Sequence, residues 1–175
     1  TPITRLRLRA ELVEDPGLQR AIAADLDEME AMIDGTLAFL RGGGDEPVRP
    51  VDVAAVVATV VAEAADAGHA ASFEEAPPAG PVVVAGRPML LKRAFANLVD
   101  NAVKHGGAAT VSLSARPDGL AVAVADPGPG IAPAERAGAF APFRRLVAAA
   151  GGPAGSGLGL TIARTAVEAH GGIIR

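Results

Sequence analysis

The chain has 175 residues, enough for one domain and an appendage, and half of them are hydrophobic. A net charge of -4 and an aromatic content of five Phe residues, with no Trp or Tyr, exclude the basic, base-stacking surface of a nucleic-acid-binding protein. The chain contains no Cys, which excludes disulfides and thiolate metal sites, and no apolar run long enough to span a bilayer, so we expect no membrane contact by this part of the protein.

Two helices are predicted first. Thr1–Glu14 carries apolar residues at helical spacings, and Asp15, Pro16 and Gly17 indicate a turn. Leu18–Leu40 then carries a seam of apolar residues at spacings of 4, 4, 3, 4, 4 and 3, which is a heptad pattern. A hairpin cannot bury such a seam alone, so we expect it to pair with a second copy into a four-helix bundle, the alternative being that the seam packs on the rest of this chain. The seam consists of Leu18, Ile22, Leu26, Met29, Ile33, Leu37 and Leu40.

The glycine-rich stretch Arg41–Pro47 is typical of a linker, and helices and strands are predicted in the rest of the chain. Asp52 stands near the start of the next helix and Gly68 near its end, as capping residues do. The order of elements predicts an α+β sandwich, with an antiparallel or mixed sheet and helices on one face. We therefore expect a hairpin over residues 1–42, a linker over 43–50 and a domain over 51–175. The predicted helices are Val51–Ala67, Pro88–His105 and Gly157–His170, and the predicted strands are Ala71–Glu75, Val82–Ala85, Thr110–Ala115, Leu120–Ala125 and one that begins at Gly171.

A polar stripe lies on the predicted helix Pro88–His105. Asn97, Asn101 and Lys104 are separated by four and then three residues, so they share one face of the helix. Carboxamide oxygens suit a hard divalent cation that keeps most of its waters, and an ammonium suits a phosphate. The stripe therefore indicates a Mg2+-phosphate site on the helix flank. The alternative is a polar stripe that only faces solvent.

Two glycine-rich stretches and an aromatic segment follow this helix. Residues 126–131 have the sequence DPGPGI and come directly after an apolar run, residues 155–160 have GSGLGL and come directly before a helical run, and residues 140–145 have FAPFRR and lie between them. Together with the polar stripe, these segments resemble, in order and spacing, the N, G1, F and G2 boxes of the ATP-binding domain of sensor histidine kinases. That domain belongs to a superfamily shared with DNA gyrase, the heat-shock chaperone ATPases and the mismatch-repair ATPases. The resemblance covers nearly the whole chain.

Asp126 ends a predicted buried strand and is followed by two glycines. A carboxylate there can accept a hydrogen bond from an exocyclic amine, and glycines let the backbone approach a flat ring closely. Alone, such a segment would indicate a turn. The resemblance implies that Asp126 holds the adenine amino group and that His105 stacks near the nucleotide. It also implies that Gly128, Gly130 and Ile131 shape the base pocket.

The second glycine-rich stretch is typical of a loop of backbone N–H groups that leads into a helix N-terminus, an arrangement that binds phosphate. It is not a Walker A loop, since no Gly-Lys-Ser/Thr follows, and it lacks the acidic residue about 20 positions on that a dinucleotide fingerprint requires. Ser156 stands where relatives often have Thr, and its hydroxyl can help. The resemblance implies nucleotide contacts from Gly155, Ser156, Gly157, Leu158, Gly159 and Leu160.

Between the two stretches, Ala132–Ala154 has weak periodicity, and we expect it to be mobile. Within this segment the resemblance implies that Arg145 approaches the terminal phosphate. It also implies that Phe140 and Phe143 are anchors that pin the lid over the site, with Phe143 beside the nucleotide.

Two positions depart from the family pattern. Arg87 stands where many relatives have Asp, so the start of the helix Pro88–His105 lacks its usual acidic cap. Ala141 stands where Glu is common. Neither position touches the nucleotide in the family pattern. Asp100 is next to Asn101 in sequence, but we expect it to point elsewhere and give it no role.

One position separates a kinase from an ATPase. In the gyrase-like and chaperone-like members a Glu stands four residues before the metal-binding Asn and activates water. Here that position is Asn97, which cannot act as a general base. The resemblance therefore implies that Asn101 binds the metal, that Lys104 binds phosphate, and that the γ-phosphate goes to a group other than water. Asn97, Lys104 and Arg145 are the expected catalytic residues, together with Thr1 for dephosphorylation.

The acceptor that the resemblance implies is a histidine. Thr1 and Pro2 match the last two positions of the family's His-Glu-x-x-Thr-Pro motif, which places the phosphorylated His four residues before Thr1, upstream of this chain. On a helix the Thr then lies one turn from the His, where its hydroxyl can orient a water for dephosphorylation of a response regulator. The alternative is that Thr1 is merely a helix residue.

We therefore expect the C-terminal catalytic part of a sensor histidine kinase. Such a protein is a homodimer that binds ATP with Mg2+, phosphorylates its own histidine, relays the phosphate to the receiver domain of a response regulator and dephosphorylates that regulator. This part is expected in the cytoplasm, with a membrane anchor upstream. One rival is an ATPase of the same superfamily, against which Asn97 and the hairpin argue. Another is a nucleotide-sensing dimerisation module without transfer activity.

Overall fold

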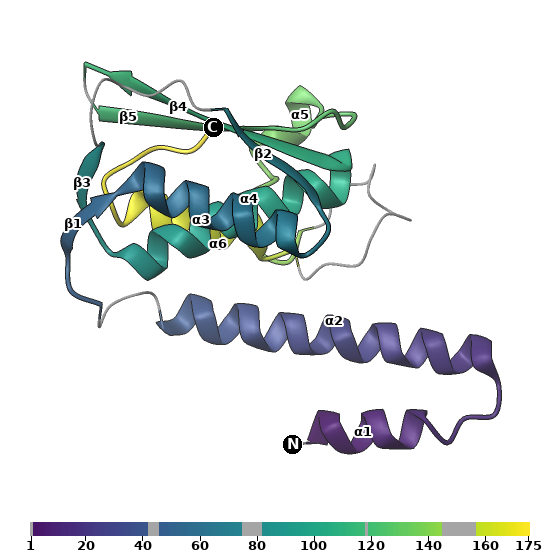
Figure 1. Cartoon of the computed structure of the whole chain (residues 1–175). Helices are drawn as coiled ribbons and strands as arrows, with labels where there is room; N and C mark the ends of the chain where they lie inside the picture. Colours follow the sequence, from purple (N-terminus) through teal and green to yellow (C-terminus); the bar gives the residue numbers. More distant parts are fainter. Residues whose placement is uncertain (1, 42–45, 75–81, 118, 145–156) are drawn as a thin grey trace.

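A long helical hairpin lies beside a compact unit in which helices cover one face of a β-sheet (Figure 1). The computed structural model describes residues 2–41, 46–74, 82–117, 119–144 and 157–175. Among these residues, no helix is both long and apolar enough to cross a lipid bilayer.

The hairpin consists of α1 (Pro2–Ala10) and α2 (Pro16–Arg41), which lie side by side and run in opposite directions. The predicted first helix extended to Glu14, but α1 ends at Ala10 because the chain turns there to reach α2. The turn is closed by Asp15, whose Oδ1 accepts hydrogen bonds from the main-chain nitrogens of Gly17 (2.7 Å) and Leu18 (3.3 Å). This carboxylate caps the first turn of α2.

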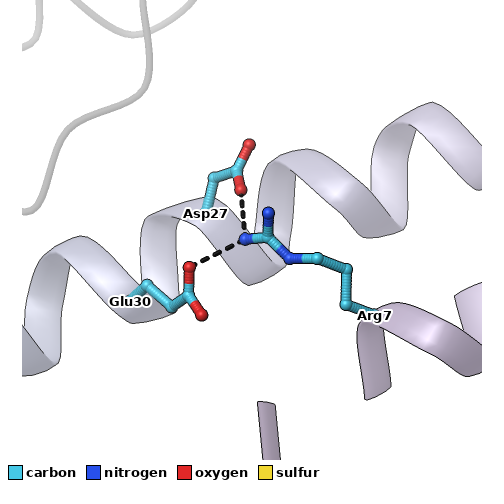
Figure 2. A network of polar contacts seen from close by, with 3 residues as sticks. All are labelled: Arg7, Asp27 and Glu30. Carbon is cyan, nitrogen blue, oxygen red and sulfur yellow. Dashed lines mark hydrogen bonds and ion pairs between the residues drawn. The ribbon is translucent and has the colours of Figure 1, made fainter. Parts of the chain in front are cut away.

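Figure 2 shows the polar contact that joins the two helices of the hairpin. The guanidinium Nη2 of Arg7 donates to Asp27 Oδ1 at 2.6 Å and to Glu30 Oε2 at 2.8 Å. All three side chains are well exposed, so this network contributes at most about 1 kcal/mol and mainly fixes the register of the helices.

The apolar seam of α2 is only partly covered in this single chain. Leu26 is buried, whereas Leu18, Met29 and Ile33 are each about half exposed. Although α2 also contacts α6 (Gly159–Glu168), that contact leaves these three side chains open. The side chains of Leu37 and Leu40 lie outside the described residues.

The sheet of the compact unit is mixed, as predicted. β4 (Ala108–Arg116) is its central strand, with β2 (Ala70–Glu74) parallel on one side and β5 (Gly119–Ala125) antiparallel on the other. A separate antiparallel ribbon joins β1 (Arg49–Asp52) to β3 (Val83–Gly86).

The helices pack on one face of this sheet, so the predicted α+β architecture is confirmed. α3 (Val53–Asp66) and α4 (Pro88–Gly106) bury apolar side chains against β4, whose residues alternate between buried and partly exposed along the strand. α6 packs on the other side of α4 through the fully buried Ala94, Ala163 and Ala166, because alanines let two helices approach closely. The main core includes Val57, Val60, Leu91, Phe95, Val99, Val111 and Leu113.

The capping prediction for α3 is confirmed: Asp52 Oδ1 accepts from the nitrogens of Ala54 and Ala55, and Gly68 follows the helix with φ of 84°. Other predictions of secondary structure differ from the structure. The predicted helix Val51–Ala67 begins only at Val53, because Val51 and Asp52 form the second half of β1. Arg49 and Pro50, expected in a linker, form the first half of β1, because pairing with β3 satisfies their backbone. Residues 171–175, expected to form a strand, pair with no described strand, and Ile174 instead packs beside the alanines of α6.

The start of α4 is held by two residues that are distant in sequence. Glu46 accepts hydrogen bonds on its carboxylate from the nitrogens of Met89 (3.0 Å) and Leu90 (3.2 Å), and its own carbonyl accepts from Arg87 Nε at 2.9 Å. His170 accepts from the Arg87 nitrogen on Nε2 at 2.9 Å. The acidic cap that the local sequence lacks is therefore supplied from 43 residues upstream of Met89.

We predict that Glu46→Ala lowers the free energy of unfolding by about 1 kcal/mol, because two N–H groups in the first turn of α4 lose their acceptor. Glu46→Gln keeps one oxygen and should lose less, since only the interaction of the charge with the helix dipole disappears. Urea unfolding followed by circular dichroism measures both variants. Equal stability of Glu46→Ala and the parent chain would contradict the capping role.

Candidate functional site

The predicted polar stripe lies on the second half of α4, and its first residue faces the start of α6. Asn97 is half-buried, and a side-chain carbon added to Gly159 would lie 3.7 Å from Asn97 Oδ1. The amide nitrogen of Asn97 is buried and has no hydrogen-bond partner among the described residues. A buried polar atom without a partner needs an explanation, and a bound oxygen supplies one. The stripe and the second glycine-rich stretch thus meet at Asn97.

Lys104 forms an ion pair that was not predicted. Its Nζ lies 2.8 Å from Asp100 Oδ2, one turn earlier on the same helix, and both side chains are about half exposed. The expectation that Asp100 points elsewhere was therefore wrong, because residues four apart share a helix flank. Such an exposed pair is weak, about 0.3–0.5 kcal/mol, so the ammonium can leave it for a more highly charged partner.

Asp126 follows β5 and lies against the end of α4. Its Oδ1 accepts a hydrogen bond from the nitrogen of Gly128 at 2.8 Å, which closes a local turn, and the residue itself is exposed. A side-chain carbon on Gly128 would lie 2.5 Å from that oxygen and 3.0 Å from the carbonyl oxygen of His105. Gly128 therefore allows a close approach of other segments of the protein, and its predicted close approach to a flat ring stays a prediction.

One residue of this contact was missed by sequence reasoning. Gly106 is the last residue of α4, and a side-chain carbon there would lie 2.6 Å from Asp126 Cβ. The sequence does contain a signal for this contact, because two glycines follow His105. One glycine is enough to end a helix, so the other indicates a second constraint. The second member, Gly107, has φ of 81° and forms that helix end.

The other predicted residues of this region occupy the rim of the site. His105 and Gly130 are exposed, and Ile131 is partly buried. Gly130 has φ of 71°, a conformation that favours glycine. The carbonyl of Ile131 accepts from Arg136 Nε at 3.0 Å, which ties the loop to the short α5 (Pro133–Arg136).

The aromatic segment is anchored differently from the prediction. Phe140 is partly buried, its carbonyl accepts from Thr161 Oγ1 at 3.0 Å, and its ring lies 5.9 Å from the guanidinium carbon of Arg164. Phe143, expected to be an anchor, is 59% exposed and has φ of 60°. That left-handed turn directs its ring to solvent, so the anchor is its main chain, whose nitrogen donates to the carbonyl of Gly157 at 3.1 Å.

Gly157 has φ of 66°, and a side-chain carbon there would lie 2.9 Å from the carbonyl carbon of Phe143. Leu158 is buried and Leu160 is half-buried, so Leu158 could contact a ligand only through its main chain. The remaining predicted site residues, Thr1, Arg145, Gly155 and Ser156, lie outside the described residues.

The carboxamide oxygens of α4 are groups of the described chain that could hold a cation. In the described part of the chain, no group of three or more His, Asp or Glu side chains could hold a metal ion. Amide oxygens on α4 remain, and these suit Mg2+ that keeps several waters and shares a phosphate ligand.

Comparison with known proteins identifies the family to which the part of the chain that contains α4 and α6 is similar. Residues 86–175 match the family described as "Histidine kinase-, DNA gyrase B-, and HSP90-like ATPase". The sensor histidine kinase GtrS of Pseudomonas aeruginosa is 38% identical over 98% of this chain and 35% of its own length. The chain spans 35–40% of the length of the curated relatives that match it first.

Two solved structures share the fold. Full-length ShkA, crystallised in complex with AMPPNP, superposes with a TM-score of 0.68 at 25% identity, covering 97% of this chain and 38% of that chain. The mycobacterial sensor histidine kinase MprB superposes with a TM-score of 0.59 at 30% identity, covering 71% of this chain and 80% of that chain.

We predict that Thr161→Val lowers the free energy of unfolding by about 1 kcal/mol, because the carbonyl of Phe140 loses its donor in a partly buried place. Thr165→Val is the matched control: its hydroxyl donates to the carbonyl of Thr161 within α6, and the residue is exposed. The control should change stability by less than about 0.5 kcal/mol. Equal losses in the two variants, measured by thermal unfolding, would show that the contact with Phe140 is unimportant.

Proposed function

Since this chain belongs to the histidine kinase-, DNA gyrase B- and HSP90-like ATPase family, we propose that it is the catalytic region of a sensor histidine kinase. It binds ATP and transfers the γ-phosphate to a histidine of the longer protein. The observation that carries this proposal is the buried amide of Asn97, which lacks a partner and faces the start of α6. A phosphate oxygen at this point would satisfy the amide.

Different residues of the site bind different parts of the nucleotide. Asp126 accepts from the adenine amine, Asn101 offers its carboxamide oxygen to Mg2+, and Lys104 leaves Asp100 to contact phosphate. Mg2+, when bound, neutralises charge on the phosphate oxygens. Arg145 approaches the terminal phosphate, and Ser156 and the main-chain nitrogens near Gly157 surround the phosphate chain. The buried amide of Asn97 and the absence of side chains at Gly128 and Gly157 fit this assignment.

Transfer to histidine is favoured over hydrolysis by the chemistry of Asn97. A neutral carboxamide cannot remove a proton from water, so the site lacks a general base where an ATPase of this family has Glu. In the transfer, an imidazole nitrogen forms a bond to the γ-phosphorus, the bond from phosphorus to the bridging oxygen breaks, and ADP leaves. We place the histidine four residues before Thr1, in the longer protein.

The transfer is tested with a chain extended upstream of Thr1 to include that histidine. Incubation with ATP labelled on the γ-phosphate and Mg2+ should give a labelled protein whose phosphate is acid-labile and base-stable, and replacement of the histidine by Gln should abolish the label. Release of inorganic phosphate without labelled protein would support an ATPase instead. Binding of ATP with neither product would support a nucleotide-sensing module.

We also propose that the phosphorylated histidine supplies a response-regulator receiver domain, and that the same protein dephosphorylates that domain. Thr1 would lie one helical turn after the histidine and would orient the attacking water. Thr1→Ala in the extended chain should therefore leave histidine phosphorylation intact while slowing release of phosphate from the regulator about tenfold. A parallel loss of both activities would assign Thr1 to the helix alone.

Because the reaction consumes ATP, we expect this part of the protein in the cytoplasm.

The exposed part of the α2 seam supports a homodimer. Leu18, Met29 and Ile33 are each about half exposed along one helix, and a second hairpin would cover them. We predict that the extended chain is a dimer by light scattering and that Met29→Glu with Ile33→Glu makes it a monomer. A parent chain that stays monomeric at high concentration would contradict the dimer.

The metal assignment predicts that Asn101→Ala removes the dependence of ATP affinity on Mg2+. Titration calorimetry should show weaker ATP binding by the parent chain when Mg2+ is chelated, because the Asn101 carboxamide then has no Mg2+ through which to hold the phosphates. In Asn101→Ala the affinity should be low with and without Mg2+. Equal affinity of the parent chain in both conditions would remove Asn101 from the metal site.

A further inference from the structure

The end of α4 and the residue that follows β5 touch at a point where no side chain would fit. A carbon added to Gly106 would lie 2.6 Å from Asp126 Cβ, 2.6 Å from its Oδ1 and 2.9 Å from its Cγ. Carbon atoms that are not bonded ordinarily stay about 3.5–4.0 Å apart. The two segments can therefore lie this close only because residue 106 is glycine.

Rotation of the Asp126 side chain could not relieve this contact. Turning about the Cα–Cβ bond moves the carboxylate but leaves Cβ in place. On its other side the carboxylate is already held by the nitrogen of Gly128 at 2.8 Å, where an added side-chain carbon would lie 2.5 Å from Oδ1. A side chain at position 106 would therefore displace the backbone of Asp126, or the end of α4, by about 1 Å to restore ordinary contact.

The backbone of α4 gives no other reason for this glycine. Gly107 has φ of 81° and ends the helix, so it is the member of the pair whose conformation needs glycine. Gly106 is the last residue of α4, and it is not one of the described glycines with positive φ, so its backbone conformation is open to a residue with a side chain. The contact with Asp126, and not the backbone conformation, is therefore what requires glycine at position 106.

We propose that Gly106 is a positioning residue that sets the place of the Asp126 carboxylate and thereby the preference for adenine over guanine. This inference rests on the proposed function in one respect, that Asp126 accepts from the adenine amine. Guanine carries a carbonyl oxygen where adenine carries that amine, so a correctly placed carboxylate attracts one base and repels the other. A displacement of about 1 Å lengthens the hydrogen bond beyond its useful range and weakens both effects.

The test compares Gly106→Ala with the parent chain in binding of ATP and GTP, each with Mg2+, by titration calorimetry. ATP affinity should fall about tenfold or more, and the ratio of ATP to GTP affinity should approach that of Asp126→Asn. Unchanged ATP affinity and an unchanged ratio would overturn the proposal.

Gly107→Ala is the matched control one residue away. A carbon added there meets nothing within 4 Å, but φ of 81° strains any residue with a side chain. This variant should lose thermal stability and keep the ratio of ATP to GTP affinity. If the ratio of ATP to GTP affinity fell as much in Gly107→Ala as in Gly106→Ala, a disturbed helix end, and not the contact with Asp126, would set the preference for adenine.

A second measurement needs no nucleotide and covers the case in which Gly106→Ala folds poorly. In the Asp126→Gly background the opposing Cβ is absent, so adding Gly106→Ala should cost little stability or even raise it, whereas the same change in the parent chain should lower the unfolding midpoint. If the stability changes of Gly106→Ala and Asp126→Gly simply added in this double-mutant cycle, the proposed contact between residues 106 and 126 would be contradicted. If Asp126→Asn leaves the nucleotide ratio unchanged, Asp126 does not read the base and that part of the proposed function fails, while the cycle still decides the contact.

Discussion

The structure depends on the burial of α4 on two sides. One side places Leu91, Phe95 and Val99 in the core beneath the sheet, and another places Ala94 against the alanines of α6. A helix that is covered on two sides has only a narrow flank left. Asn97, Asn101 and Lys104 occupy this flank, so the packing that stabilises the domain also determines where polar ligands can reach it.

Much of this arrangement could be predicted from periodicity. The apolar spacing of the helices and the alternation in β4 follow directly from burial on one side, and the mixed sheet with helices on one face was predicted and is confirmed. The stripe on α4 was predictable for the same reason, because a fixed helical repeat places residues three and four apart on one flank.

Some features could not be predicted because they depend on contacts between distant segments, and others were misjudged although they are local. Glu46 caps a helix that starts more than 40 residues later, and no local sequence pattern predicts a capping residue so far away. Asp100 was dismissed although helical spacing placed it beside Lys104. Phe143 was assigned an anchoring side chain because the family resemblance implies one, but its backbone adopts a left-handed turn that turns the ring outward. Gly106 was overlooked since only the folded chain brings Asp126 to it.

The position of Glu46 also has a mechanical consequence. Four residues separate it from Arg41, where α2 ends, and its side chain and carbonyl both attach to the first turn of α4 and the residue before it. Tension or torque that travels along the chain from the hairpin would therefore be delivered to α4 at Glu46, before it reached the β1–β3 ribbon or the sheet. The helix that carries the polar flank would thus be the first part of the compact unit to bear a load.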